Sequence, residues 1–280
     1  MNEISHATYD TLTIGSLEEL IKELLCLRDE GFWSFRGQRK EEWDLCLHSI
    51  HSKREHQLLD VSLTQFKKRC MEFSKPEWLD DDPWRWLFYA QHHKLRTRLL
   101  DWTTNPLVAL YFAVENILSS KQDGIEDKKN EKYYGGDFGA VWALKVHEDH
   151  FRSPEEAGDP EKLTDWIMIN PPPVSKRIVR QSGKFSYHPF RRGSTLEPSL
   201  NYALNQMARR PGEKLIKIVI KGKDNINPSK KIRNQLGIMN IHHAALFPDA
   251  DGVAHFVNNE WHDIALSYKK QIREAESTNF

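Results

Sequence analysis

Three short stretches of this chain carry more polar side chains and glycines than packing requires. The first is Phe35-Arg36-Gly37-Gln38, where an arginine follows the apolar run 32–35. A buried arginine must meet an anion or a carbonyl because its guanidinium cannot be deprotonated. The glycine lets a ligand approach the backbone closely. Two interpretations stay open here: Arg36 holds two strands together through an internal aspartate, or it binds an anionic ligand.

The second stretch, 91–106, begins with Gln91-His92 and ends with Asp101-Trp102-Thr103-Thr104-Asn105-Pro106. It is dense in hydrogen-bond donors, and Asn105-Pro106 marks a helix start, where backbone N–H groups favour an anion. The stretch therefore predicts an anion-binding site. The structural alternatives are Asn105 as an ordinary N-cap, Asp101 as the buried partner of Arg36 or Arg98, and Trp102 as a core residue.

The third stretch is Phe247-Pro248-Asp249-Ala250-Asp251-Gly252. Its alternating aspartates resemble a calcium loop, but the full loop pattern is incomplete, so a turn with Asp251 as a helix N-cap is the simpler interpretation. The histidine pairs 92–93 and 242–243 do not predict a metal site, because adjacent residues do not share a face and no H-x-x-x-H spacing occurs.

Composition limits the class of protein. The 280 residues contain 40 basic and 40 acidic side chains, which excludes a polyanion binder held by overall charge. Aromatic residues make up 11% of the chain, which indicates a folded core. Cys26, Cys46 and Cys70 form no C-x-x-C pair, and no apolar run reaches the length of a membrane span. These features predict a soluble, cytoplasmic protein without a membrane partner.

Hydrophobic periodicity predicts interspersed helices and strands without strict βαβ alternation. The expected class is therefore α+β, a single domain with a mixed β-sheet flanked by helices. The expected strands are 11–14, 32–35, 139–146, 177–181 and 215–220; the expected helices are 17–27, 56–73, 83–93, one from 106, a short one around Leu200, Leu204 and Met207, 229–237 capped by Ser229, and 251–256. In the strand 139–146, Val141 and Ala143 should face one side of the sheet, and Trp142 and Leu144 the other. Segment 121–137 is charged and poor in apolar residues, which predicts a surface insertion.

Taken in order, these stretches resemble the FRG domain, a bacterial family named for the tripeptide at Phe35-Arg36-Gly37. The family pattern is also similar to Gln91 through Ala113, to Gln181–Phe185 and to Phe247–Gly252. His93 departs from it, because relatives usually carry an aromatic residue such as tyrosine there. The resemblance divides the chain into an N-terminal extension (1–14), the FRG domain (15–262, with the insertion at about 121–137) and a tail (263–280).

The order of elements in this family is similar to that of ADP-ribosyltransferase-type folds. That resemblance implies NAD as a substrate, with no metal, and a carboxylate that stabilises the oxocarbenium-like transition state. The implied catalytic residues are Arg36, Asp101, Asp249 and Asp251, with a slight preference for Asp249 among the late carboxylates. The implied NAD-binding residues are Arg36, Gly37, Gln38, His92, Arg98, Trp102, Thr103 and Gln181.

Three functions are compatible with these residues. One is an NAD-consuming ADP-ribosyltransferase-like enzyme, a bacterial toxin or antiphage defence effector with a nucleic acid or protein as acceptor and an antitoxin or defence-system partner. Another is a non-catalytic module that binds a nucleotide or RNA through Arg36, Arg98, Arg177, Arg180 and a surface of Trp and Phe side chains. The third is a scaffold in which the polar residues form one buried network. We favour the enzyme, because the polar groups cluster at strand ends and helix starts, where pockets form.

Overall fold

The computed structural model of the protein describes residues 9–27, 31–43, 45, 47, 53–73, 79–115, 138–172, 176–189, 211–222, 228–259, 261 and 268. The insertion expected at 121–137 and the helix expected around Leu200, Leu204 and Met207 lie outside the described residues.

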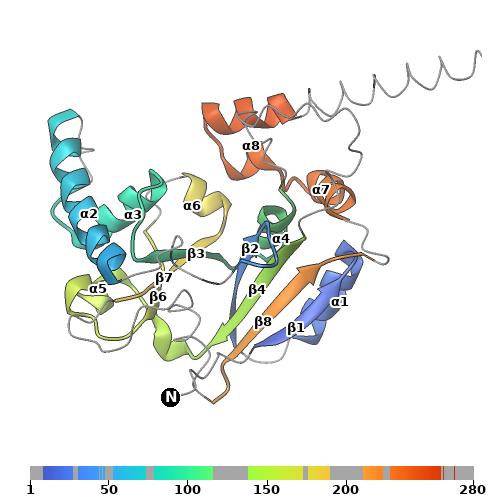
Figure 1. The fold of residues 1–280 in the computed structure, drawn as a ribbon, viewed down its shortest axis with the longest axis horizontal. Coiled ribbons are helices and arrows are strands. Elements are labelled where there is room, and N and C mark those ends of the chain that lie inside the picture. The colour runs from blue at the N-terminus through green and yellow to red at the C-terminus, as the bar shows by residue number, and fades with distance from the viewer. Residues whose placement is uncertain are drawn as a thin grey trace, which may run out of the picture.

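Within the described ranges, eight strands form one curled, mixed sheet, which confirms the α+β class (Figure 1). The spatial order is β1-β8-β4-β2-β3-β7-β6-β5. The pairs β1–β8 and β5–β6 are parallel, and the other neighbours are antiparallel. The strands are β1 (Asp10–Ile14), β2 (Phe32–Gln38), β3 (Leu99–Thr103), β4 (Gly139–Val146), β5 (Phe151–Arg152), β6 (Ile167–Ile169), β7 (Gly183–Tyr187) and β8 (Lys214–Ile220).

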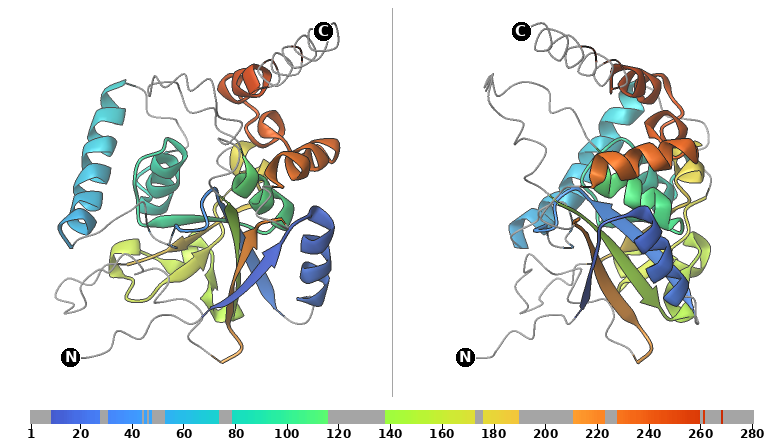
Figure 2. Two further views of the ribbon diagram at one scale, coloured as in Figure 1. Left: turned by 45° about the vertical axis from the view of Figure 1, so that its right-hand side comes forward. Right: turned by 90° about the vertical axis from the view of Figure 1, so that its right-hand side faces the viewer.

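Helices gather above the sheet in the view of Figure 1, while α1 packs beside β1 (Figures 1 and 2). The helices are α1 (Leu17–Cys26), α2 (Lys53–Phe73), α3 (Pro83–His92), α4 (Pro106–Val114), α5 (Pro154–Ala157), α6 (Lys176–Arg180), α7 (Ser229–Ile238) and α8 (His243–Leu246), with short 3₁₀ turns at Glu148–His150 and Pro160–Lys162. A further helical stretch covers 250–259. Asp82 and Asn105 cap α3 and α4, each with a proline in the first turn, as the sequence predicts.

The alternation expected in β4 is confirmed. Val141 and Ala143 join a core cluster with α1, α4 and α7, while Trp142 and Leu144 enter a second cluster on the opposite side of the sheet. A third cluster beneath α3 contains Phe88 and Phe185. The sheet is thus covered by apolar side chains on both faces, and it fixes the strand ends around which the polar stretches lie.

Gly37 has a packing role that differs from the one we expected. A Cβ at this position would overlap the carbonyl oxygen of Ala109 and lie 2.8 Å from the backbone nitrogen of Ala113. The missing side chain therefore lets α4 approach β2 at backbone distance, and Gly37 also lines a cleft beside β2 and β3.

Two local predictions were wrong. Residues 177–181 are not a strand: Lys176–Arg180 form α6, and Ser182, with φ of 48°, turns the chain into β7. A five-residue stretch with one packed apolar side chain, Ile178, fits a helical turn as well as a strand. Ser229 is not the cap of α7 either, because Pro228 takes the N-cap position and makes no side-chain bond there.

Candidate functional site: a basic, aromatic cleft at the β2–β3 junction

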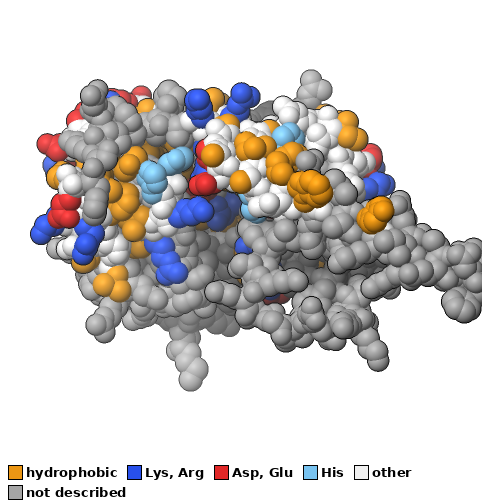
Figure 3. All heavy atoms as spheres, turned by 90° about the horizontal axis from the view of Figure 1, so that it is seen from above, with side chains coloured by type: hydrophobic (Ala, Val, Ile, Leu, Met, Phe, Trp, Pro, Cys, Tyr) orange, Lys and Arg blue, Asp and Glu red, His pale blue; other side chains and the backbone are white. Residues whose placement is uncertain are grey.

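A cleft of about 400 Å³ opens beside the junction of β2 and β3. These strands pair at a single position, Phe35 with Thr103, and residues from α3, α4 and α6 close the cleft from above. Its lining includes five basic residues, two acidic ones and several aromatic rings. Figure 3 looks onto the helical side of the molecule, where Lys and Arg side chains gather near the middle. The basic residues of the lining are Arg36, Arg39, Lys94, Arg177 and Lys184, and the acidic ones are Asp101 and Glu115.

Arg36 and Asp101 meet in this cleft, as the sequence predicts. Nη1 of Arg36 donates to the backbone carbonyl of Asp101 over 2.8 Å and lies 3.8 Å from Oδ2 of the Asp101 carboxylate. The two side chains are 23% and 55% exposed. Arg36 therefore ties β2 to β3 beyond their single paired position, while the Asp101 carboxylate faces open space.

A chain of hydrogen bonds orients the Asp101 carboxylate. Nε2 of Gln91 donates to Oδ2 of Asp101 over 2.9 Å, and Oγ1 of Thr97 donates to Oε1 of Gln91 over 2.7 Å. The backbone N–H of Leu99 in turn donates to the Thr97 hydroxyl. The Gln-His and Thr-Arg-Leu-Leu-Asp parts of the second stretch thus act together, because Gln91 at the end of α3 holds a carboxylate of β3 in place.

The floor of the cleft is built from residues that also hold the fold together. The Thr103 hydroxyl donates to the Gln181 carbonyl over 2.6 Å, and the Gln181 side chain donates to the Leu246 carbonyl. Oε1 of Gln38 accepts a bond from the Trp142 indole over 2.7 Å. Three of the predicted binding residues, Gln38, Thr103 and Gln181, therefore line the cleft, each fixed by a bond to another element.

His92, also a predicted binding residue, lines the cleft at the end of α3. Burial holds the pKa of His92 below its ordinary value, and the nearby charges of Arg177 and His93 lower this pKa further. A neutral imidazole in this position offers one donor and one acceptor to a bound molecule.

Arg177 is the second cation with a defined position in the cleft. Its Nη2 donates to Oδ2 of Asp249 over 2.9 Å, and its guanidinium lies 4.5 Å above the ring of Phe247. The sequence analysis included Arg177 only under the nucleic-acid-binding alternative, since it was assigned to a strand. The helical turn of α6 instead turns this side chain toward the cleft.

The late aspartates Asp249 and Asp251, which the resemblance implied as catalytic residues, are not among the residues that line the cleft. Oδ1 of Asp249 accepts the backbone N–H of Gly252 over 2.8 Å, so Asp249, and not Asp251, caps the helical stretch 250–259. This bond, followed by the Arg177 contact, holds the pKa of Asp249 below its ordinary value. Asp251 is exposed in the first turn of that helix.

Of the predicted binding residues Arg98 and Trp102, only Trp102 is among the residues that line the cleft. Arg98 is buried and forms a two-pronged ion pair with Asp60, with N–O distances of 3.0 and 2.7 Å. Trp102 borders the cleft, but its indole is buried in the second core cluster, where Nε1 donates to the Ser186 hydroxyl. Asp101 and Trp102 alternate along β3, so their side chains leave the strand on opposite faces.

Several cleft residues were missed by the sequence analysis, among them Trp43, Phe112, Glu115 and Phe247. For Glu115, a usable signal was present: it follows Tyr111 by four residues at the end of a predicted helix, the spacing that brings two side chains together. The aromatic residues carried no such signal, because only the fold brings the segment after β2, helix α4 and the end of α8 to one cavity.

Among the described residues, no cluster of three or more His, Cys, Asp or Glu side chains is arranged to hold a metal ion. In that same part of the chain, no helix is both long enough and apolar enough to span a membrane.

The fold and this cleft define an α+β domain with a polar site at a strand junction. Residues 32–122 match the family model of the FRG domain, which confirms the resemblance over this range. The matched range contains Arg36, Gln91 and Asp101, whereas the stretches at 181–185 and 247–252 lie outside it. No curated protein and no solved structure matches the chain.

Proposed function

We infer that the cleft binds NAD or a related nucleotide and breaks the bond between nicotinamide and ribose. The observation that carries this proposal is the lining of the cleft. In a chain with equal numbers of acidic and basic residues, five basic and two acidic residues line this cavity, together with several aromatic rings. Basic groups attract a diphosphate, and aromatic rings accept a base or a nicotinamide by stacking.

The proposed roles follow from the positions of the side chains. Arg36, which is 23% exposed, binds the diphosphate, and its planar fork can contact two phosphate oxygens. The aromatic residues Trp43, Phe112 and Phe247 take the rings. Asp101, which Gln91 orients and which is 55% exposed, faces the ribose, where its negative charge stabilises the oxocarbenium-like transition state.

In this reaction the bond between C1′ of the ribose and the nicotinamide nitrogen breaks. Nicotinamide leaves with the bonding electron pair as a neutral molecule, and a nucleophile forms the new bond to C1′. With water as the nucleophile, the products are ADP-ribose, nicotinamide and a proton. With a hydroxyl or another group of a protein or nucleic acid, the product is an ADP-ribosylated acceptor.

The proposal includes an ADP-ribosyltransferase-like arrangement, supported by the order of elements: a basic residue on β2, then the β3 strand end, then α4. We assign the stabilisation of the oxocarbenium-like transition state to Asp101, which lines the cleft, and not to Asp249 or Asp251. Consumption of NAD would suit a bacterial toxin or an antiphage defence effector, which a cognate antitoxin or defence-system partner would restrain.

The partial exposure of Arg36 and Asp101 argues against a purely structural network. Arg36 donates to the backbone carbonyl of Asp101, and the Asp101 carboxylate is more than half exposed. Arg98 with Asp60 shows what a structural pair looks like in this same protein, with a buried guanidinium and two short bonds.

Release of nicotinamide from NAD tests the proposal directly. We expect the wild-type protein to release nicotinamide and to be toxic when expressed, and Arg36→Ala and Asp101→Ala to abolish both while remaining folded. Arg85→Ala is the matched control, because Arg85 forms ion pairs on the outer side of α3 and does not line the cleft. Salt-dependent binding of NAD or RNA without any nicotinamide release would instead identify a binding module and contradict the catalytic proposal.

A further inference from the structure

The cleft contains a second carboxylate, Glu115, that belongs to none of the sequence stretches. Glu115 follows the last residue of α4 and lines the same cavity as Arg36 and Asp101. Its side chain is 9% exposed, whereas Asp101 is 55% exposed. Burial of a carboxylate is costly unless it is hydrogen-bonded, so the groups that hold Glu115 need an explanation.

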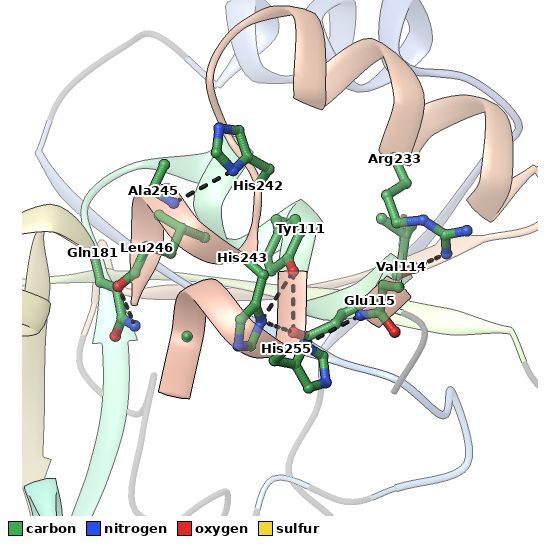
Figure 4. A network of polar contacts seen from close by, with 12 residues as sticks. Tyr111, Val114, Glu115, Gln181, Arg233, His242, His243, Ala245, Leu246 and His255 are labelled. Atoms are coloured by element: carbon green, nitrogen blue, oxygen red, sulfur yellow. Dashed lines mark hydrogen bonds and ion pairs between the residues drawn. The ribbon is translucent and has the colours of Figure 1, made fainter. Parts of the chain in front are cut away.

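Two donors from different elements hold this carboxylate. The Tyr111 hydroxyl, one turn earlier on α4, donates to Oε1 of Glu115 over 3.0 Å, and Nδ1 of His243, the first residue of α8, lies 2.7 Å from the same oxygen. Figure 4 shows the three side chains turned toward one another. Both of these bonds end at Oε1, and Glu115 also lines the cleft.

Both groups are in the protonation state that lets them donate a hydrogen bond to Glu115. Burial, followed by the charge of Glu115, raises the pKa of Tyr111 far above its ordinary value, so the phenol stays a donor. A bond from Nδ1 of His243 to a carboxylate sets the tautomer with the proton on Nδ1. The His243 ring packs against two other rings, with its centroid 4.3 Å from that of Phe247 and 4.0 Å from that of His255.

Charged and titratable side chains from α4, α7, α8 and the helical stretch 250–259 lie around Glu115. Tyr111 comes from α4 and His243 from α8. His255 comes from the helical stretch 250–259, where burial lowers its pKa and His243 lowers it further. Arg233 of α7 donates to the Val114 carbonyl over 3.4 Å, which places a positive charge at the same helix end.

We propose that Glu115 is the catalytic base of the cleft and that Tyr111 and His243 are its positioning residues. Glu115 takes a proton from the attacking water or acceptor hydroxyl as the oxygen bonds to C1′ and nicotinamide leaves. The proton then passes from the carboxylic acid to solvent. Asp101 keeps the separate task of stabilising positive charge on the ribose, so two carboxylates with different exposure divide the work. This inference rests on the proposed cleavage of NAD.

Glu115→Gln separates this inference from the proposal on which it rests, because glutamine keeps the shape of the side chain but cannot accept the proton. We expect the Kd for NAD, measured by calorimetry, to stay within about threefold, and kcat for nicotinamide release to fall at least about 100-fold. Glu155→Gln, an exposed change on α5, is the matched control and should leave both unchanged. A Glu115→Gln variant that binds NAD and keeps kcat within about threefold overturns the base role while leaving NAD cleavage intact. A wild-type protein that releases no nicotinamide overturns both.

The positioning residues have a readout of their own in the pH dependence of kcat. Tyr111→Phe and His243→Leu each remove a bond to the charged form of Glu115, so the acid limb of the profile should move to higher pH. His243→Asn, whose side-chain N–H can replace the Nδ1 donor, should restore the wild-type profile. Profiles of Tyr111→Phe and His243→Leu that superimpose on the wild-type profile would contradict these roles, with thermal unfolding as the check that both variants are folded.

Discussion

Arg36 and Arg98 each lie close to an aspartate, but they differ in side-chain exposure and in how closely they contact that aspartate. The Arg98 side chain is 8% exposed and binds Asp60 through two N–O contacts of 3.0 Å or less. The Arg36 side chain is 23% exposed, makes its short bond to a backbone carbonyl and stands 3.8 Å from the Asp101 carboxylate. The buried, two-pronged pair of Arg98 is typical of a structural role. The partly exposed guanidinium of Arg36, in the wall of the cleft beside an exposed carboxylate, is in a position to bind a ligand.

The same contrast occurs inside the tripeptide Phe35-Arg36-Gly37. Phe35 belongs to the first core cluster, and Gly37 admits the backbone of α4, so both shape the fold. All three residues line the cleft, and Arg36 is the charged one. The short motif therefore combines two residues that also pack the fold with one charged residue that is partly exposed in the cleft.

Arg36→Lys should give the largest effect on NAD affinity among the following variants. Lysine keeps the charge but loses the planar fork, and loss of a charge-assisted bond costs about 2 kcal/mol, or roughly 30-fold in the Kd for NAD. Calorimetric titration measures the affinity, and Arg85→Lys is the control outside the cleft. An unchanged Kd for Arg36→Lys would remove the difference from Arg98 on which the site assignment depends.

Arg98→Ala should change stability instead of binding. Loss of the buried two-pronged pair with Asp60 should lower the free energy of unfolding by about 2 kcal/mol, measured by urea denaturation. The folded fraction should bind NAD with wild-type affinity, because Arg98 does not line the cleft. Reduced affinity at full stability would show that Arg98 acts on the ligand after all.

Asp249→Asn should have a smaller effect through Arg177. Asparagine can still cap the helical stretch 250–259, so the change removes mainly the charge that holds Arg177. We expect the Kd for NAD to rise about threefold, since partly exposed ion pairs contribute about 0.2–1 kcal/mol. Asp251→Asn, two residues away and exposed, is the matched control and should change nothing. An equal loss of NAD affinity in Asp249→Asn and Asp251→Asn would contradict this expectation and would place both aspartates at the binding site.

The smallest expected effect concerns pH. Burial holds the pKa values of His92, His93 and His255 below 6.5, their ordinary value. Below that pH the unfolded chain binds more protons than the folded protein, so the free energy of unfolding should fall from about pH 7 to about pH 5. His92→Gln should reduce this slope. A slope identical to that of the wild-type protein would show that His92 titrates normally.

Local sequence patterns predicted the helix caps at Asp82 and Asn105, the two faces of β4 and the meeting of Arg36 with Asp101. These features depend on short-range chemistry or on the need of a charge for a partner. The patterns could not predict that Gly37 faces a helix, that Arg98 pairs with Asp60 or that Glu115 meets His243. Each of these contacts joins elements that are distant along the chain, so it is set by packing of the whole sheet and its helices.

A crystal structure of the protein soaked with NAD tests the central claim most directly. The account predicts electron density for the dinucleotide in the cleft beside β2 and β3, with the diphosphate at Arg36, the ribose at Asp101, and Glu115 facing C1′. Density at the cleft for nicotinamide and ADP-ribose as separate products would agree equally well. A fully soaked crystal with NAD bound away from Arg36 and Asp101 would contradict the account.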